Sequence, residues 1–311
     1  MILSYLKLAL GPMLWGAALV AGRVVSADLP PLTITWVRFV LVSLMLVPIV
    51  RFREGRLPRP SLTDMMTLLL LSITGVVMFN LLLFSGLRTV TAVRSSVILA
   101  LSPSVVALVL VTFFGERAGW NTAAGIAVAF AGAVLTITNG ELSRAVAGGL
   151  SVGDLFILGC VISWSAYTII ARYAMRNLAS LTVLAYSSVL GSLLLTPFAA
   201  RADVITEFAS ASAVTWFAFA YLVFGAAGLA YLMYYEGIRE VGPNRAAVFI
   251  NLEPVTAIVL GVGLLGEGLS LPVLAGAALV ILGLYLVNRP AHRPRPADPS
   301  AAPAVTPGRD E

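Results

Sequence analysis

Long apolar runs dominate the chain, and short polar stretches separate each run from the next. A helix needs about 20 consecutive apolar residues to cross the hydrocarbon core of a bilayer. The pattern predicts ten membrane-spanning helices, at about 5–25, 32–50, 64–86, 92–114, 120–138, 154–172, 180–199, 213–236, 244–265 and 271–288. The predicted fold class is therefore an all-α polytopic membrane protein.

The two ends of the chain need separate treatment. The first apolar stretch lacks the short apolar core and small-residue cleavage site of a signal peptide, so we expect it to be the first span, uncleaved. Residues 289–311 are rich in Pro and Ala and cannot bury a core. We expect them to form a disordered cytoplasmic tail.

Composition agrees with the membrane assignment. Of the 311 residues, 59% are hydrophobic and 11% are charged, whereas a soluble domain carries about 25% charged residues. The mean hydropathy is +0.96 and the pI is about 9.7. The basic residues lie mainly in short loops and in the tail, as a membrane topology signal does, so we expect no nucleic-acid partner.

The distribution of Lys and Arg also predicts orientation. With the N-terminus inside, most of the 20 Lys and Arg residues fall on the cytoplasmic side, and the loop RFREGRLPRP at 51–60 is the strongest single signal. Cytoplasmic segments of membrane proteins carry the excess of Lys and Arg. An even number of spans then places both termini in the cytoplasm, in a multi-pass protein of the cell membrane.

The chain contains an internal repeat. A shift of 151 positions aligns the later parts of two halves, and a shift of 149 aligns their front parts. The matched pairs include Gly86/Gly237, Arg88/Arg239, Arg94/Arg245, Pro103/Pro254, Glu116/Glu267, Trp15/Trp164 and Pro48/Pro197. The predicted domains are 1–139 and 150–288, with five spans each. Five is odd, so the halves enter the membrane from opposite sides, as in many secondary transporters.

Three stretches carry a resemblance to a known family: LWGAALVAGR at 14–23, SPSVVALVLVTFFGER at 102–117 and EPVTAIVLGVGLLGE at 253–267. The chain resembles an EamA-type member of the drug/metabolite transporter superfamily over nearly its whole length except the tail. The resemblance implies two inverted five-helix repeats around a central cavity, and export of small metabolites or drugs. Ser163-Trp164-Ser165 departs from the Trp-Gly of the family pattern, and the motifs name no substrate.

Glu253 is the most unusual polar residue, because it is an acid beside a proline inside an apolar run. Its repeat mate is Ser102, so the repeat does not explain the acid. A buried carboxylate is costly unless it is protonated or paired. Glu253 is therefore either a structural acid, paired with an Arg such as Arg38 or protonated and hydrogen-bonded, or a proton-coupling or cation-binding site that faces the cavity.

Other residues are candidates for the cavity, its hinges and its gates. The candidate substrate-binding residues are Trp15, Arg38, Asn80, Ser102, Trp164, Tyr167, Tyr231 and Asn251. An Arg embedded in a span usually faces a cavity or a partner, so Arg38 is a candidate for binding an anionic group. The aromatic residues could instead form interface belts or core packing. Pro103 and Pro254 are hinges or simple kinks, and Glu116 and Glu267 are gates or helix-end markers.

The chemistry available to the chain is limited. The single cysteine, Cys160, and the single histidine, His292, exclude an internal disulfide, a His/Cys metal site and a His-based catalytic triad. No GxxxxGK[ST] motif is present, so ATP is not the energy source. We expect an alternating-access secondary transporter without a cofactor, not an enzyme. Its partners are a small-molecule substrate, the lipid bilayer and, as a candidate coupling ion, protons.

Two alternatives to that function stay open. A passive facilitator or lipid-linked sugar carrier of the same fold would share these features. A membrane-embedded enzyme would need a cluster of catalytic polar residues, whereas this chain offers isolated ones. The sequence specifies neither the substrate nor the oligomeric state.

Overall fold

The computed structural model describes residues 2–116, 119–141, 150–242 and 246–287, and this part of the chain is helical without strands. The elements of the first half are α1 (Ile2–Asp28), α2 (Pro31–Arg53), α3 (Leu62–Leu71), η1 (Ser72–Met78), α4 (Phe79–Leu87), α5 (Ala92–Leu99), α6 (Ser102–Phe114) and α7 (Trp120–Thr138). Those of the second half are α9 (Val152–Ala174), α10 (Ser180–Ala199), α11 (Val204–Ala209), α12 (Ala213–Ala220), η2 (Tyr221–Leu229), α13 (Ala230–Val241), η3 (Ala247–Asn251), α15 (Leu252–Leu265) and α16 (Leu271–Val287).

Across these residues, nine helical stretches are long and apolar enough to span a membrane, and Leu271–Val287 is a shorter apolar helix. Each predicted span coincides with helical structure, with ends that differ by a few residues. The short helix α11 was not predicted. The start of the predicted span 244–265 and the predicted tail 289–311 lie outside the described residues.

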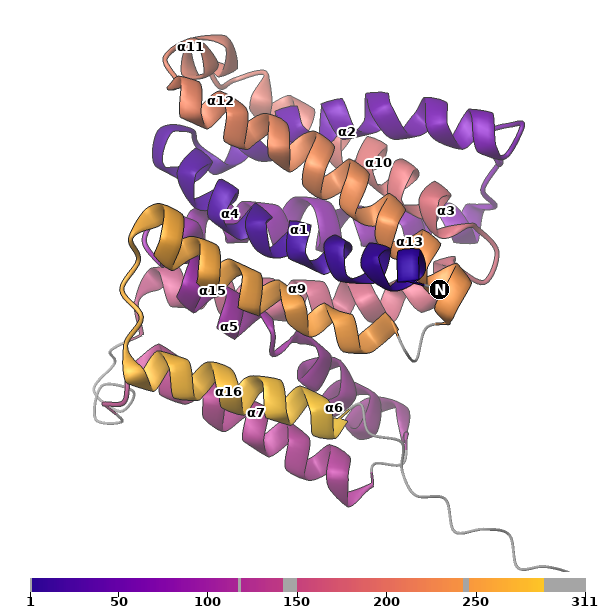
Figure 1. Cartoon of the computed structure of the whole chain (residues 1–311). Coiled ribbons are helices and arrows are strands. Elements are labelled where there is room, and N and C mark those ends of the chain that lie inside the picture. The colour runs from indigo at the N-terminus through magenta and orange to yellow at the C-terminus, as the bar shows by residue number, and fades with distance from the viewer. Residues whose placement is uncertain (1, 117–118, 142–149, 243–245, 288–311) are drawn as a thin grey trace, which may run out of the picture.

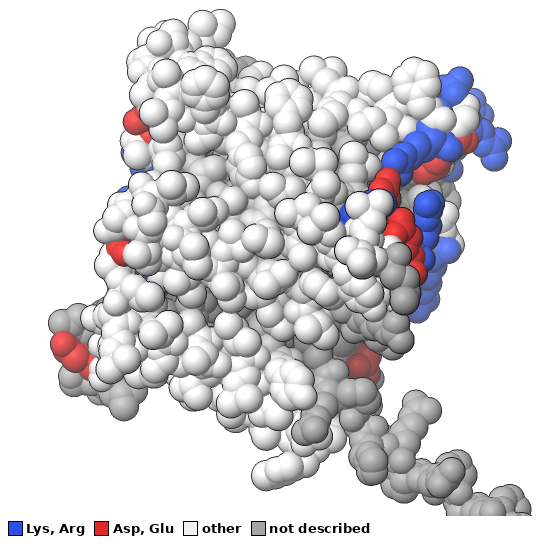
Figure 2. All heavy atoms as spheres, in the orientation of Figure 1, with Lys and Arg blue, Asp and Glu red and all other residues white. Residues whose placement is uncertain are grey.

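The helices run side by side (Figure 1), and charge gathers at the two ends of the bundle (Figure 2) with a broad uncharged band between them. At the end where the chain begins, Lys7 Nζ pairs with Glu236 Oε2 at 3.0 Å and with Glu240 Oε1 at 3.2 Å. Arg53 Nη2 lies 3.5 Å from Glu236 Oε1 at the same end. This distribution of charge fits a protein whose middle is surrounded by hydrocarbon.

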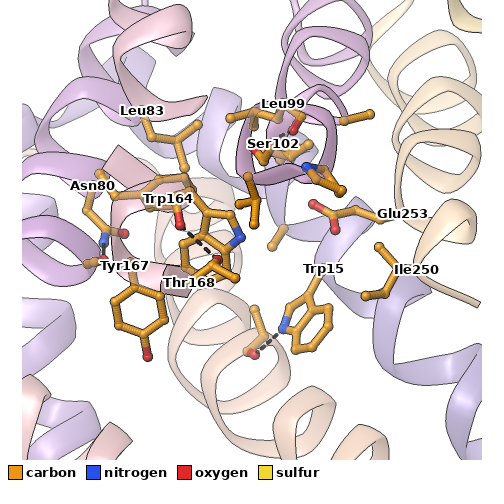
Figure 3. Close-up of a pocket in the computed structure, with 18 of the residues that line it drawn as sticks. Trp15, Asn80, Leu83, Leu99, Ser102, Trp164, Tyr167, Thr168, Ile250 and Glu253 are labelled. Atoms are coloured by element: carbon orange, nitrogen blue, oxygen red, sulfur yellow. Dashed lines mark hydrogen bonds between the residues drawn. The ribbon is translucent and has the colours of Figure 1, made fainter. Parts of the chain in front are cut away.

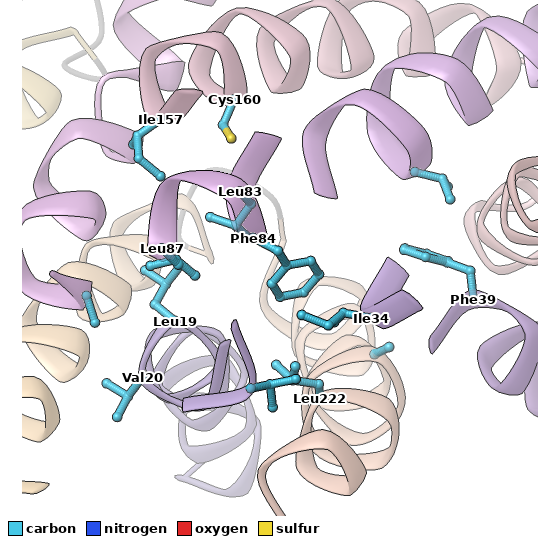
Figure 4. Close-up of a cluster of buried hydrophobic side chains, with 14 of the residues drawn as sticks. Leu19, Val20, Ile34, Phe39, Leu83, Phe84, Leu87, Ile157, Cys160 and Leu222 are labelled. Atoms are coloured by element: carbon cyan, nitrogen blue, oxygen red, sulfur yellow. The ribbon is translucent and has the colours of Figure 1, made fainter. Parts of the chain in front are cut away.

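The apolar core lies where the halves meet. Leu83, Phe84 and Leu87 of α4 are buried against side chains from α1, α2, α9 and η2, among them Ile34 and Leu222 (Figure 4). Phe84 is 1% exposed and Leu87 is fully buried. Both halves therefore contribute to one core, and neither half packs as a separate unit.

The helix contacts recur in pairs. Helix α1 packs along α13 as α9 packs along α4, and α1 packs along α15 as α9 packs along α6. The offsets of 149 and 151 residues that align the two halves of the sequence convert α1 into α9, α4 into α13 and α6 into α15. Each contact of α1 therefore has a counterpart made by α9. The repeat mates α2 and α10 pack against each other, as do the mates α7 and α16.

Four glycines bring α7 and α16 into backbone contact. A Cβ added to Gly132 would lie 2.6 Å from Gly276 O, and one added to Gly125 would lie 2.7 Å from Gly283 O. Larger side chains at these positions would clash with the facing backbone. Small residues of this kind allow helices in lipid to approach closely.

Polar contacts at the two ends of the bundle follow the same offsets. The Asn177 amide donates to Asp64 Oδ1 at 2.9 Å, next to the helix cap of α3. At the equivalent place Asp28 accepts a hydrogen bond from Thr215 Oγ1 at the cap of α12. Thr182 donates to Glu54, and its mate Thr33 donates to Glu207.

Four of the spans contain irregular helix. Two π-helices occupy matching places in the halves, since η1 shifted by 151 positions falls on η2. The fourth span breaks between α5 and α6, and the ninth begins with the 3₁₀-helix η3 before α15. The kinks expected at Pro103 and Pro254 fit these two irregular segments, because a proline removes the backbone hydrogen bond to the carbonyl four residues earlier and so disrupts the helix just before itself. A hinge role for either proline stays a prediction. Pro103 stands at the start of α6 and Pro254 in the first turn of α15, where prolines are tolerated.

Candidate functional site

A cavity of about 730 Å³ lies in the middle of the bundle between the two halves. Residues from α1, α2, η1, α4, α6 and α9 line it, together with residues from η2, α13 and α15. Small-molecule sites usually measure about 300–1,000 Å³, so the cavity has the size of a binding site for one small molecule.

The structure brings most of the predicted site residues to this cavity. The lining includes Trp15, Arg38, Asn80, Ser102, Trp164, Tyr167, Tyr231, Asn251 and Glu253, both prolines Pro103 and Pro254, and Glu116. Glu267 is not part of the lining. Whether these residues bind substrate stays a prediction. Sequence reasoning missed Phe79, Thr168, Ser187 and Arg172, which look like ordinary span residues until the helices are placed.

Aromatic rings form two groups on the cavity wall, and Figure 3 shows Trp164 with Tyr167 in one place and Trp15 in another. Trp164 stacks on Tyr167 with ring centroids 5.0 Å apart and planes at 21°, and Phe79 lies 5.0 Å from the same indole. The repeat mate Trp15 makes edge contacts with Tyr231 and Tyr234 at 5.0 and 5.2 Å. The cavity therefore offers flat apolar surfaces from both halves.

Arg38 and Asn80 form the polar part of the wall on α2 and α4. Arg38 Nη1 donates to Asn80 Oδ1 at 3.0 Å. Asn80 is 2% exposed, and its amide nitrogen donates to Gly75 O at 3.1 Å and Val76 O at 2.9 Å. The Arg38 side chain also lies over the Phe39 ring, with Cζ 5.5 Å from the centroid.

Glu253 extends from the first turn of α15 toward the side of the cavity that carries Trp164 (Figure 3). No described residue makes a hydrogen bond or ion pair with its carboxylate. The alternative in which Glu253 pairs with Arg38 is therefore wrong for this structure. The break before α15 places a helix N-terminus beside the carboxylate, and helix N-termini favour negative charge.

The two Gly-Glu motifs lie in different surroundings. The cavity lining reaches Glu116 and Arg172, whose side chains are 55% and 51% exposed and lie 3.4 Å apart. At the other end, Glu267 Oε1 accepts from Ala92 N at 2.8 Å and Oε2 accepts from Val93 N at 2.9 Å. Glu267 thus caps the N-terminus of α5 from the C-terminal end of α15.

A buried ion pair lies at the same end as Glu267. Arg94 Nη2 contacts Asp154 Oδ2 at 2.7 Å and Ile137 O at 2.5 Å, and the Asp154 side chain is 1% exposed. Arg94 is thus held in place at this end of the bundle. Together with the Glu267 cap, this pair joins α5 to α9, α7 and α15. Arg245, the repeat mate of Arg94, lies outside the described residues.

Metal chemistry finds no support in the described part of the chain, which holds no group of three or more His, Cys, Asp or Glu residues able to bind a metal ion. Cys160 is buried, and its thiol lies 3.4 Å from Phe79 O.

Comparisons with known proteins agree with this geometry. The model of the EamA-like transporter family matches residues 2–138 and 151–289. An uncharacterized inner membrane transporter of Escherichia coli, YedA, is 28% identical over 302 residues, which cover 94% of this chain and 92% of YedA. A probable terminal-alkyne amino-acid exporter of Streptantibioticus cattleyicolor is 26% identical over 231 residues, covering 74% of this chain and 75% of that protein.

A solved crystal structure matches with a TM-score of 0.61 at 17% identity, over 91% of this chain and 96% of the other. At that identity the likeness supports the fold alone.

Proposed function

The chain belongs to the EamA-like transporter family, and we propose that it is a secondary transporter that exports a small metabolite, amino acid or drug-like compound by alternating access. That it is a multi-pass membrane transporter, and so not an enzyme in the usual sense, follows from the family and the apolar helices. The observation that carries the proposal is the central cavity of about 730 Å³, whose lining includes the exposed Glu116 and Arg172 at one end but not Glu267 at the other.

We further propose ten spans arranged as two inverted repeats, residues 1–139 and 150–288. The repeated contacts support this arrangement, because α1 with α13 and α9 with α4 are exchanged by the sequence offsets. The contact of Gly125 with Gly283 likewise corresponds to that of Gly276 with Gly132. A pseudo-two-fold axis between α7 and α16 would produce this pattern, and such symmetry lets two halves exchange conformations.

The orientation follows from charge in this proposal. The bundle end with Lys7, Arg53 and the loop 51–60 faces the cytoplasm, as the excess of basic residues favours. Glu116 lies at that end and Glu267 at the outer end. The structure then corresponds to an inward-facing state, in which the Glu267 cap of α5 is part of the outer gate.

Glu253 is the proposed coupling site. Its carboxylate faces the cavity without a partner among the described residues, so protonation would remove an uncompensated buried charge and ease the exchange between the two states. The substrate class stays broad. One relative's name includes amino-acid export, which makes amino acids one candidate class for this chain.

The test is flux in proteoliposomes with the pH gradient on and off. Glu253→Gln, which mimics the protonated form, should fold and exchange substrate for substrate but lose its response to the gradient. Asp203→Asn removes an exposed acid outside the cavity and should keep that response. If the Gln variant retains full gradient-driven transport, Glu253 is a structural acid. If the unmodified protein ignores the gradient, it is a passive facilitator.

A further inference from the structure

We propose that Arg38 is the receptor for a carboxylate group of the substrate, and that Asn80 is the positioning residue that aims Arg38 into the cavity. This inference rests on the proposed transport function and adds the chemical class of the substrate. It depends on the partners of three groups, which are the Arg38 guanidinium, the Asn80 amide and the backbone of η1.

The Arg38 guanidinium lacks a negative partner. It has five N–H donors, of which Nη1 binds Asn80 and the buried Nε has no hydrogen-bond partner. No Asp or Glu of the described residues forms an ion pair with it, while the Phe39 ring and Tyr231 interact with it electrostatically. An Arg within a membrane span usually faces a partner or a cavity. Since Arg38 lines the cavity, a ligand can supply the missing charge.

The Asn80 side chain is fixed in one orientation. Both of its amide hydrogens are used by Gly75 O and Val76 O, so the amide oxygen is the atom left to accept from Arg38. If the amide were turned over, its NH₂ group would face the N–H donors of the guanidinium, and its oxygen would face the two carbonyl oxygens. Neither arrangement forms a hydrogen bond. One neutral, buried residue therefore sets the direction of the cation without neutralising it.

The π-helix η1 makes this arrangement possible. Gly75 and Val76 belong to it, and its backbone hydrogen bonds run to the fifth residue, as from Phe79 N to Thr74 O. This shift opens carbonyls to side-chain donors, and π-helical turns often occur at functional sites. In an ordinary α-helix the same carbonyls would be taken by the backbone.

The second half has the π-helix but not the charge. In η2 the equivalent carbonyl, Ala226 O, accepts from the Trp15 indole at 3.1 Å. The repeat mate of Asn80 is Tyr231, and that of Arg38 is Ser187. Arg172, the other Arg on the lining, already pairs with Glu116 at the cavity mouth. The site for an anion is thus on one wall only.

The surroundings favour a carboxylate over a phosphate. A planar guanidinium binds either group through paired hydrogen bonds. Glu253 lines the same cavity without a partner, however, and would repel a doubly charged phosphate more than a singly charged carboxylate. The rings of Trp15 and Trp164 suit an apolar or aromatic body. The substrate class is a small carboxylic acid of that kind.

Binding to the purified full-length protein in nanodiscs tests the proposal, with thermal unfolding as the readout. The probes are a panel of small carboxylic acids, each matched with its neutral amide, together with phenyl phosphate. We expect at least one acid to stabilise the protein more than its amide does. Arg38→Gln should remove that preference and weaken acid binding on the order of tenfold or more. Arg38→Lys should keep part of it, and the control Arg88→Gln, which removes an exposed Arg outside the cavity, should keep all of it.

The Asn80 role has its own measurement. For the acid identified, Asn80→Ala should raise KM in proteoliposome transport far more than it lowers the maximal rate, and should leave binding of the amide unchanged. A fall in maximal rate alone would make Asn80 a structural residue.

Two results would overturn the carboxylate site: acids that stabilise the protein no more than their amides, or an acid preference that survives in Arg38→Gln. Preferential binding of phenyl phosphate would also overturn it. Release of a water-soluble metabolite mixture from proteoliposomes separates this failure from failure of transport. If compounds without a carboxylate leave faster than from protein-free vesicles, transport stands and only the carboxylate site is wrong. If nothing leaves faster, both proposals are wrong.

Discussion

On the proposed alternating-access function, replacing Glu267 with Gln should shift the protein away from the inward-facing state. The carboxylate accepts two backbone hydrogen bonds, from Ala92 N and Val93 N, and it joins the end of α15 to the start of α5. Gln offers one acceptor, and its NH₂ group would face the second N–H donor. The variant therefore loses one charge-assisted bond, weakens the other and leaves one donor unpaired.

The size of the shift follows from these contacts. A hydrogen bond to a charged group contributes about 1.5–3 kcal/mol. Glu267 is half-buried, so each of its two bonds contributes about 1.5 kcal/mol. Losing most of two such bonds costs about 1.5–3 kcal/mol. If the bonds exist only while the outer end is closed, the ratio of inward-facing to outward-facing protein falls roughly 10- to 150-fold.

Cysteine labelling can measure that ratio. Cys160 is the only cysteine and is buried, so a Cys160→Ala background gives a clean starting point. Thr122→Cys then places a reporter on the cavity lining at the Glu116 end. Glu267→Gln should slow its reaction with a maleimide applied from the cytoplasmic side, whereas Glu116→Gln should not. An unchanged labelling rate, in a variant that unfolds at the same temperature as its parent, would show that the cap does not hold the outer end closed.

Three further outcomes are expected. Gly132→Ala should destabilise the fold by about 1–3 kcal/mol through overpacking, because the new Cβ would lie 2.6 Å from a backbone oxygen. The control Gly263→Ala, whose new Cβ would have nothing within 4 Å, should not destabilise it. Equal unfolding temperatures for the two variants would contradict this prediction. Pro254→Ala should supply a backbone donor and stiffen the start of α15, so transport should fall more than thermal stability; equal losses would make Pro254 a packing residue. Reporters inserted in 51–60 and 140–152 should read cytoplasmic and external respectively, and a cytoplasmic reading for 140–152 would exclude the inversion.

The spans were predictable because each is a run of apolar residues, and hydrocarbon imposes that requirement locally along the chain. The π-helices were not. Nothing in Ser72–Met78 distinguishes a π-helix from an α-helix, whereas Pro103 does predict the break at Ala100–Leu101 just before it. The π-helices depend on contacts with other helices, such as the Asn80 amide on Gly75 O.

The cavity residues were predicted better than their partners. An embedded Arg38 and an isolated Glu253 stand out in an apolar sequence, and both line the cavity. One expectation was that Arg38 and Glu253 pair with each other, but in the structure Arg38 donates a hydrogen bond to Asn80 instead. Glu267 shows the same limit, since its partners Ala92 and Val93 are backbone groups about 175 residues away and carry no signal in their side chains.

The glycine contacts between α7 and α16 also bear on how motion in this protein can be measured. Two helices that touch through backbone, as at Gly132 and Gly276, have no side chains between them to repack, so they cannot slide past each other without a clash. We expect this pair to move as one rigid piece. Spin labels on the outer faces of α7 and α16 should keep a constant separation under all conditions, and so provide the fixed frame against which displacements of the other helices can be recorded.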